Sequence, residues 1–145
     1  MSLENWLNSH LIEKYKSSSE EIRELLAVAD TEIKDFQVSV LSKSTRYMLA
    51  FHVVLRLSMI ALYGLGYRIT DRNKHHYLAI ASLEFTTGSD KKEIRYFDKA
   101  RQKRHGSVYD TGDEITETEL EELMEKVIKL REKTGIWLNE AHLFF

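Results

Sequence analysis

The fold is decided by the stretch YMLAFHVVLRLSMIALYGL, residues 47–65, which is apolar on every side of a predicted helix and interrupted only by His52, Arg56 and Ser58. A helix that is apolar all round is either enclosed by other helices or placed in a membrane. The length of the stretch is borderline for crossing a bilayer, which requires roughly 20 predominantly apolar residues. We therefore expect it to be the central helix of a soluble bundle.

Four further helices are expected around this central one, because apolar residues recur with helical spacing on both sides of it. Ser18 with Glu21, and Thr116 with Glu119, match the capping box that opens a helix. Glycines that follow the central stretch and the fourth helix are candidate stops. The expected helices cover residues 18–36, 44–63, 75–86, 91–106 and 116–137. Gly64 and Gly66 are the expected stops of the central helix, and Gly106 is expected to end or bend the fourth.

Few residues in the chain interrupt regular structure, since it has no proline and only six glycines. No segment has a pattern that predicts a strand, and residues 67–74 read as a polar connection. Residues 1–16 are expected to form an arm or a short helix. With 145 residues the chain suggests one domain. The predicted fold is all-α: an antiparallel bundle of four to five helices over residues 1–145.

Composition excludes several classes of function. A net charge of −2 and a pI near 6.3 mean that any nucleic-acid binding must come from a local basic patch. The absence of cysteine excludes disulfides, thiolate metal sites and a cysteine nucleophile, and it fits a cytoplasmic protein. No signal peptide is visible at the N-terminus. The sequence contains no metal-ligand spacing, glycine-rich phosphate loop or serine-nucleophile motif, so no cofactor is expected.

A polar cluster in the fourth predicted helix is the main candidate for a site. At about 100° per residue, Arg101, Arg104 and His105 fall on the same stripe as the apolar Ile94 and Phe97. Burying such groups without partners costs several kcal/mol, so they need a counterion or water. Polar residues where local rules favour leucine indicate a functional position.

Three segments, taken in order, resemble the HEPN family of helical domains. They are YGLGYR at 63–68, HHY at 75–77 and ARQKRHGSVY at 100–109, followed by a long amphipathic helix. The resemblance covers residues 18–140 and is strongest to the small stand-alone prokaryotic branch whose arginine-rich helix ends in tyrosine. It implies a HEPN-like bundle, a homodimer and, in active members, a metal-independent endoribonuclease of the toxin–antitoxin or defence type. A nucleotidyltransferase is an expected kind of partner.

The family motif is an arginine, a polar residue, a few variable residues and a histidine. In one alignment Arg104 is the arginine and His105 the polar residue, and Tyr109 stands where the catalytic histidine is expected. In the other, Arg101 is the arginine and His105 the histidine, with three residues between them, one fewer than the usual minimum. Both alignments depart from the family pattern.

The residue types suit RNA cleavage without a metal. Histidine can transfer the proton of the ribose 2′-hydroxyl because its ordinary pKa is near 6.5. Arginine can hold two phosphate oxygens through its planar fork. A tyrosine can stack on a base or donate a hydrogen bond, and lysines add positive potential. The expected catalytic residues are Arg101, Arg104 and His105, and the expected substrate contacts are Tyr109, Lys103 and Lys99.

A structural interpretation competes with this site. Arg101 and Arg104 could pair with acidic residues of the last helix or of a second subunit, and Tyr109 could be a core residue. The chain would then be a non-catalytic dimeric helical module that binds a nucleotide or a partner protein.

Other polar residues are expected to be structural. His75 and His76 are adjacent, so on a helix they point about 100° apart and form a poor metal site; one of them could anchor the start of a helix. His52 and Arg56 could form a buried polar contact beneath the arginine cluster, or pair with an acidic residue of the preceding helix. The acidic candidates on that helix are Asp30, Glu32 and Asp35.

Overall fold

A computed structural model describes residues 2–109 and 115–141, without the side chains of residues 104–109. Within this part the chain is mainly helical, so the all-α prediction is confirmed in its coarse form, with one small sheet added. The elements are α1 (Leu3–Asn8), β1 (Ile12–Lys14), α2 (Ser19–Phe36), α3 (Lys43–Leu65), β2 (Tyr67–Ile69), α4 (His75–Ser82), α5 (Lys91–Tyr109) and α6 (Glu117–Glu140).

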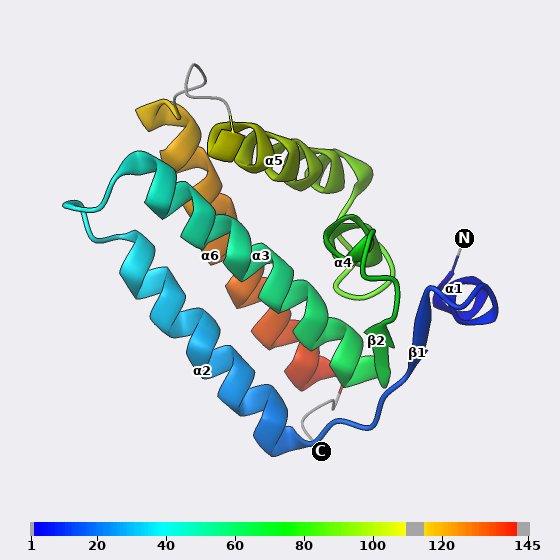
Figure 1. Cartoon of the computed structure of the whole chain (residues 1–145). Helices are drawn as coiled ribbons and strands as arrows, with labels where there is room; N and C mark the ends of the chain where they lie inside the picture. Colours follow the sequence, from blue (N-terminus) through cyan, green and yellow to red (C-terminus); the bar gives the residue numbers. More distant parts are fainter. Residues whose placement is uncertain (1, 110–114, 142–145) are drawn as a thin grey trace.

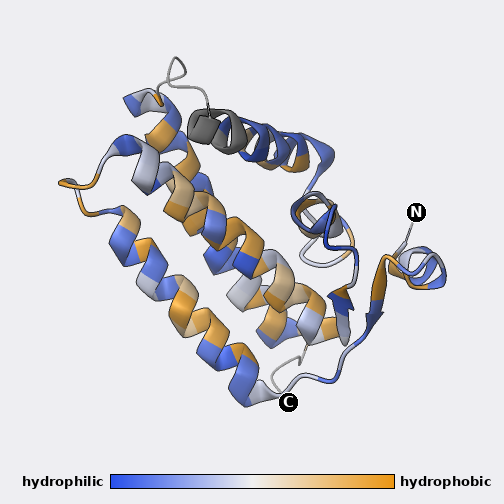
Figure 2. Cartoon of the chain, in the orientation of Figure 1, coloured by the Kyte–Doolittle hydropathy of each residue, from blue (hydrophilic) through white to orange (hydrophobic). Residues whose placement is uncertain are grey.

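Helix α3 is central, as its apolar sequence predicts. It contacts α2, α4, α5, α6 and β2. In Figure 1, α2 lies along one side of α3, while α4 and α5 lie on the other side. Figure 2 shows apolar residues along much of α3, whereas α5 is largely hydrophilic. Side chains from every face of α3 are buried, among them Phe51, Val54, Leu57 and Ile60.

The ends of the long helices follow the predicted capping chemistry. The Ser18 hydroxyl accepts from the backbone N–H of Glu21 at the start of α2, and Thr116 forms a complete capping box with Glu119 at the start of α6. Gly66 ends α3 with φ +89°, a left-handed conformation that favours glycine. Helix α4 ends at Ser82, earlier than predicted, because the chain turns through residues 83–87.

The prediction that the chain has no strand was wrong. β1 and β2 pair antiparallel, with Ile12 opposite Ile69 and Glu13 opposite Arg68. Glu13 and Arg68 form an ion pair across the two strands, and Ile12 is buried. Each strand has three residues, too few to show an alternating pattern, and their pairing depends on contacts between segments that are distant in sequence.

Residues 2–14 are neither a free arm nor part of the main core. They form α1 and β1, which bury Trp6 and Ile12 against Leu78 of α4 in a second, smaller apolar cluster. Figure 1 shows α1 and β1 at the edge of the molecule, next to β2. The sheet therefore holds the N-terminal segment against the α4 side of the fold.

Among the described residues, helix α3 alone is long and apolar enough to cross a membrane. Most of its apolar stretch, 61%, is buried inside the fold. The central helix of a soluble protein has the same composition, so this property carries no conclusion about location.

Candidate nucleic-acid interface along helix α5

Helix α5 begins where the sequence predicts and is attached to the core by a short apolar face. The Asp90 carboxylate accepts from the backbone N–H of Glu93 at 2.8 Å and caps the first turn. Phe97 and Ala100 are buried against the main core, and Ile94 is half-buried at its edge. At the other positions as far as Lys103, the long polar side chains are exposed or partly exposed.

Arg101 is paired but not sealed in the interior. Its Nε donates to Asp98 Oδ1 at 2.7 Å, and its side chain remains 32% exposed. Its guanidinium carbon lies 5.8 Å from the centre of the Tyr77 ring, within the range of a cation–π contact. The expected carboxylate partner is therefore present, but it comes from the same helix and not from α6 or a second subunit.

Lys103 joins α5 to α6. Its Nζ lies 2.6 Å from Oε2 of Glu119, the residue that completes the capping box of α6. This hydrogen bond, with those from Thr116, holds the pKa of Glu119 below its ordinary value. Lys103, which was predicted to contact substrate, is thus engaged by a carboxylate of α6 in this structure.

Three predicted site residues fall outside the described side chains. Arg104, His105 and Tyr109 lie on the last turns of α5, whose backbone is helical as far as Tyr109. Gly106 therefore does not end the helix, which was one of the two alternatives expected for it. The placement of these residues on α5 keeps Arg101, Arg104 and His105 within about one turn of one another, because residues three and four apart share a helix face.

A groove of about 470 Å³ runs between α5 and α6 on the face that holds Lys99. Four cationic side chains line it, together with Tyr96 and three acidic residues. Lys126 Nζ lies 4.8 Å from the centre of the Tyr96 ring, and burial together with the Glu122 carboxylate raises the pKa of the Tyr96 hydroxyl. The hydroxyl therefore stays protonated and able to donate a hydrogen bond near neutral pH. The cationic residues are Lys92, Arg95, Lys99 and Lys126.

These cations differ from Arg101 and Lys103 in having no carboxylate partner among the described side chains. Within residues 2–103 and 115–141, ion pairs hold Arg101 and Lys103, but none within 4.0 Å involves Lys92, Arg95, Lys99 or Lys126. Two of the three acids in the groove have other roles, since Asp90 caps α5 and Glu93 accepts from a neighbouring serine hydroxyl. We call these four cations the α5 basic face.

Sequence analysis included Lys99 but missed the other members of the α5 basic face. Lys92, Arg95 and Lys99 recur at helical spacing, so a stripe of cations could have been recognised. Lys126 could not, because its place beside Tyr96 depends on how α6 packs against α5. The predicted site was centred on the motif at residues 101–109, which lies one to two turns further along α5.

The remaining predicted polar contacts are structural. Arg56 Nε donates to Glu32 Oε1 at 2.6 Å, one of the alternatives that the sequence left open. His75 and His76 lie in the first turn of α4, and their rings are 6.0 Å apart. The described residues include no group of three or more histidine, aspartate or glutamate side chains that could hold a metal ion.

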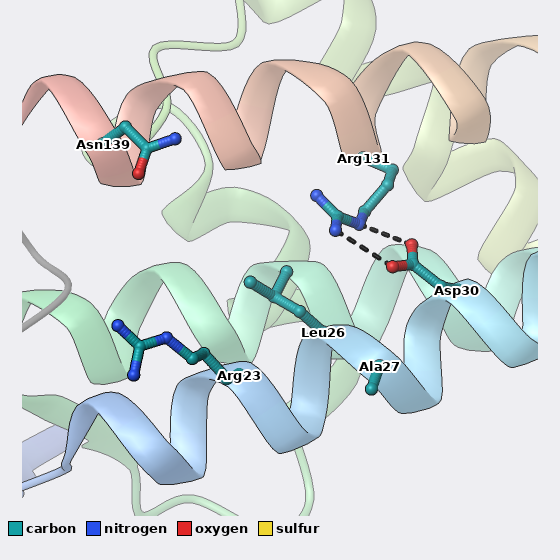
Figure 3. A pocket seen from close by; sticks show the side chains of 6 residues that line it. All are labelled: Arg23, Leu26, Ala27, Asp30, Arg131 and Asn139. Atoms are coloured by element: carbon teal, nitrogen blue, oxygen red, sulfur yellow. Dashed lines mark hydrogen bonds and ion pairs between the residues drawn. The ribbon is translucent and has the colours of Figure 1, made fainter.

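A second hollow, between α2 and α6, contains an arginine that is already neutralised (Figure 3). Arg131 of α6 donates to both oxygens of Asp30, at 2.7 and 3.1 Å. Gly135 leaves room for this arrangement, since a Cβ there would lie 2.9 Å from Nη1 of Arg131. Because a carboxylate occupies its guanidinium fork, Arg131 is less available to an anionic ligand than the cations of the α5 basic face.

Comparisons of this chain with protein-family models, with curated proteins and with solved structures found no match.

Proposed function

We propose that this protein is a HEPN-like RNA-binding module whose contact surface is the α5 basic face. The observation that carries the proposal is the set of four cations that border one groove without carboxylate partners in the described structure. Residues 91–104 contain seven lysines and arginines against two acidic residues, a net of +5 in a chain whose net charge is −2. Such a local excess attracts a polyanion to one face of the molecule.

Single-stranded RNA suits this surface better than a duplex. Sequence-tolerant binding of single strands combines a cationic groove with aromatic rings on which bases stack. Tyr77 is 50% exposed and lies beside Arg101, so an aromatic face adjoins the cations of α5. The acidic remainder of the chain limits contact to this one side.

Cleavage of the bound RNA is the further activity that the family resemblance implies. Arg101 and Arg104 would hold the scissile phosphate, His105 would transfer protons, and Tyr109 would contact a base. Arg101 could reach a phosphate because it is partly exposed and only its Nε is engaged by Asp98 in the described structure. The mechanism needs no metal, since histidine supplies the proton transfer and arginine stabilises the charge that develops on phosphorus.

Two observations favour the alternative, a non-catalytic dimeric module that binds a nucleotide or a partner protein such as a nucleotidyltransferase. Arg101 and Lys103 are engaged by carboxylates, and Tyr109 stands at the position of the expected histidine. This alternative keeps the HEPN-like fold and the homodimer but removes the chemistry.

RNA binding is tested with labelled single-stranded RNA and fluorescence anisotropy. Replacing Lys92, Arg95, Lys99 and Lys126 by glutamine should weaken binding by at least about tenfold, because each cation near a phosphate contributes to the affinity. A matched control removes four exposed lysines elsewhere, Lys14, Lys16, Lys34 and Lys129. Equal losses in the two variants, or no binding by the wild type, would contradict the proposal.

Cleavage is tested separately, by incubating the same RNA with the protein in EDTA. Products formed by the wild type and lost in both Arg104→Ala and His105→Ala would establish the enzyme. Binding without cleavage, by folded protein free of inhibitor, would favour the non-catalytic module. Sedimentation of the wild type measures whether it is a homodimer.

A further inference from the structure

A second cleft, which shares Arg95 with the α5 basic face, has aromatic walls. It occupies about 460 Å³ where α1, α4 and α5 meet. Trp6, Tyr77, Phe85 and Ile94 form its apolar lining. Besides Arg95, the cleft includes Tyr77, the exposed ring of the proposed RNA surface, but its interior residues Trp6 and Phe85 belong to neither the family motif nor that surface.

The rings of the cleft are arranged from its base to its rim. Trp6 is 3% exposed, Phe85 is half-buried, and Tyr77 is 50% exposed at the opening. The Trp6 and Phe85 rings meet edge to face with centres 5.5 Å apart. A planar ligand entering beside Tyr77 would therefore meet one exposed ring face and an apolar interior, an arrangement suited to stacking.

Two cations and one carboxylate stand at the opening. Lys91 and Arg95 are four residues apart on α5, both line the cleft, and both are exposed. Like charges at this spacing repel each other, and neither residue has a carboxylate partner within 4.0 Å among the described residues. Glu84 is exposed on the α4 side of the same opening. An anionic group between Lys91 and Arg95 would relieve their repulsion.

Trp6 supplies a second indication that the cleft takes a ligand. Its indole Nε1 is buried and has no hydrogen-bond partner in the described part of the chain. Buried N–H groups are nearly always paired, because leaving one unpaired is costly. A residue that only filled the space between α1 and α4 would need no N–H, whereas this N–H could donate to an acceptor atom of a ligand.

From these features we infer that the cleft binds a nucleotide. The base lies against Tyr77, Phe85 and Ile94, and the phosphate lies between Lys91 and Arg95. Glu84 accepts a hydrogen bond from an amino or imino N–H on the edge of the base. The nucleotide can be free or can be one unit of an RNA chain. The inference requires neither cleavage nor RNA binding along α5.

The test measures the binding of AMP, GMP, CMP and UMP to the whole protein by isothermal titration calorimetry, with inorganic phosphate and the corresponding nucleosides as partial ligands. We expect saturable binding of at least one nucleotide, and clearly weaker binding of phosphate or nucleoside alone. In a Trp137→Phe background Trp6 is the sole tryptophan, so the same titration should change its fluorescence.

The variants separate stacking from charge. Tyr77→Ala should weaken binding about 5- to 150-fold, the effect of removing one base–aromatic stack, while Tyr77→Phe should retain it. Lys91→Gln should weaken nucleotide binding but not nucleoside binding, and Lys129→Gln is the matched control. Circular dichroism checks that each variant is folded.

Several outcomes would overturn the inference. They are the absence of saturable binding at about 1 mM nucleotide, equal affinity in the wild type and Tyr77→Ala, and binding of phosphate as tight as that of the nucleotide. RNA oligomers distinguish the source of the base. If Tyr77→Ala weakens RNA binding and free-nucleotide binding alike, the cleft takes a base of the RNA; if only nucleotide binding falls, it takes a free nucleotide.

The two proposals fail separately. Loss of nucleotide binding with intact RNA binding removes only this inference. Both proposals are supported if the variant that lacks the α5 basic face loses RNA binding while Lys92→Gln and Lys99→Gln still bind the nucleotide. RNA binding that is insensitive to the α5 basic face removes only the proposed function.

Discussion

The α2–α6 face and the N-terminal half of α5 use arginine and lysine in opposite ways. On the first, Arg131 of α6 holds Asp30 of α2 with both arms of its fork. Elsewhere on α2, Glu32 is held by Arg56 of α3, and each of these pairs joins two helices. On the second, the α5 basic face has no carboxylate partner in the described structure. A count of charges would treat these regions alike, but only the second is available to an anionic ligand.

The strongest test of this contrast removes the anchor of α5. Phe97 is fully buried and is the largest side chain with which this helix enters the core. Phe97→Ala should lower the free energy of unfolding by about 3–5 kcal/mol, as large core truncations do. Denaturant unfolding measures the change. Ile128→Ala, at a 42% exposed position of α6, is the control and should change stability by less than about 1 kcal/mol. A small effect of Phe97→Ala would mean that α5 is held by its polar contacts.

The second test concerns salt. For single strands, the logarithm of the binding constant falls with the logarithm of salt concentration by about 0.7 per phosphate contact. If all four cations of the α5 basic face contact phosphates, replacing them by glutamine should reduce that slope by about 3. The four-lysine control should keep the wild-type slope. An unchanged slope in the first variant would place the RNA elsewhere.

A single pair of substitutions compares the two regions directly. Arg131→Met should cost up to about 1 kcal/mol of stability, since its partner Asp30 is half exposed and such pairs contribute little. It should leave RNA binding unchanged. Arg95→Met should do the reverse, lowering RNA affinity with no loss of stability. If both substitutions lowered stability, or both lowered RNA affinity, the contrast between the two regions would be contradicted.

The smallest expected effect is a pH dependence at the junction of α5 and α6. The Lys103 ammonium is the main cause of the lowered pKa of Glu119. A carboxylate with a lowered folded-state pKa stabilises the protein above its ordinary value of 4.5, and this contribution is lost as the pH falls through the folded-state value. Lys103→Gln should therefore lower stability at neutral pH and make it less dependent on pH below 4.5. Unfolding midpoints of both proteins over this range would show whether the curves converge in acid.

Much of the helical architecture could be predicted because it depends on local signals. The capping residues Ser18 and Thr116, the apolar stretch of α3 and the start of α5 at Lys91 all follow from residues close together in sequence. The sheet could not be predicted, since Ile12 meets Ile69 across more than fifty residues. The central role of α3 could be predicted from its own apolar sequence. Which elements pack against it could not, because those contacts join segments that are distant in the chain.

The site was harder to predict than the fold. Sequence patterns identified α5 as the important helix but selected Arg101 and Lys103, which pair with Asp98 of the same helix and with Glu119 of α6. Which cations remain without partners depends on where the carboxylates lie in space. The aromatic cleft depends on three elements that meet only after folding, so Trp6 and Tyr77 gave no combined signal in the sequence.

The burial of α3 has a consequence for how the protein is made. Together with α2, α6 makes the most extensive contacts with this apolar helix, and the last residue of α6 follows the end of α3 by about 75 residues. At synthesis rates of about 5–20 residues per second, that interval lasts roughly 4–15 seconds. During it the nascent chain carries a 23-residue apolar segment without its final partner, a substrate for chaperones at the ribosome. The risk of misassembly in this protein is therefore concentrated in the time before its last helix emerges.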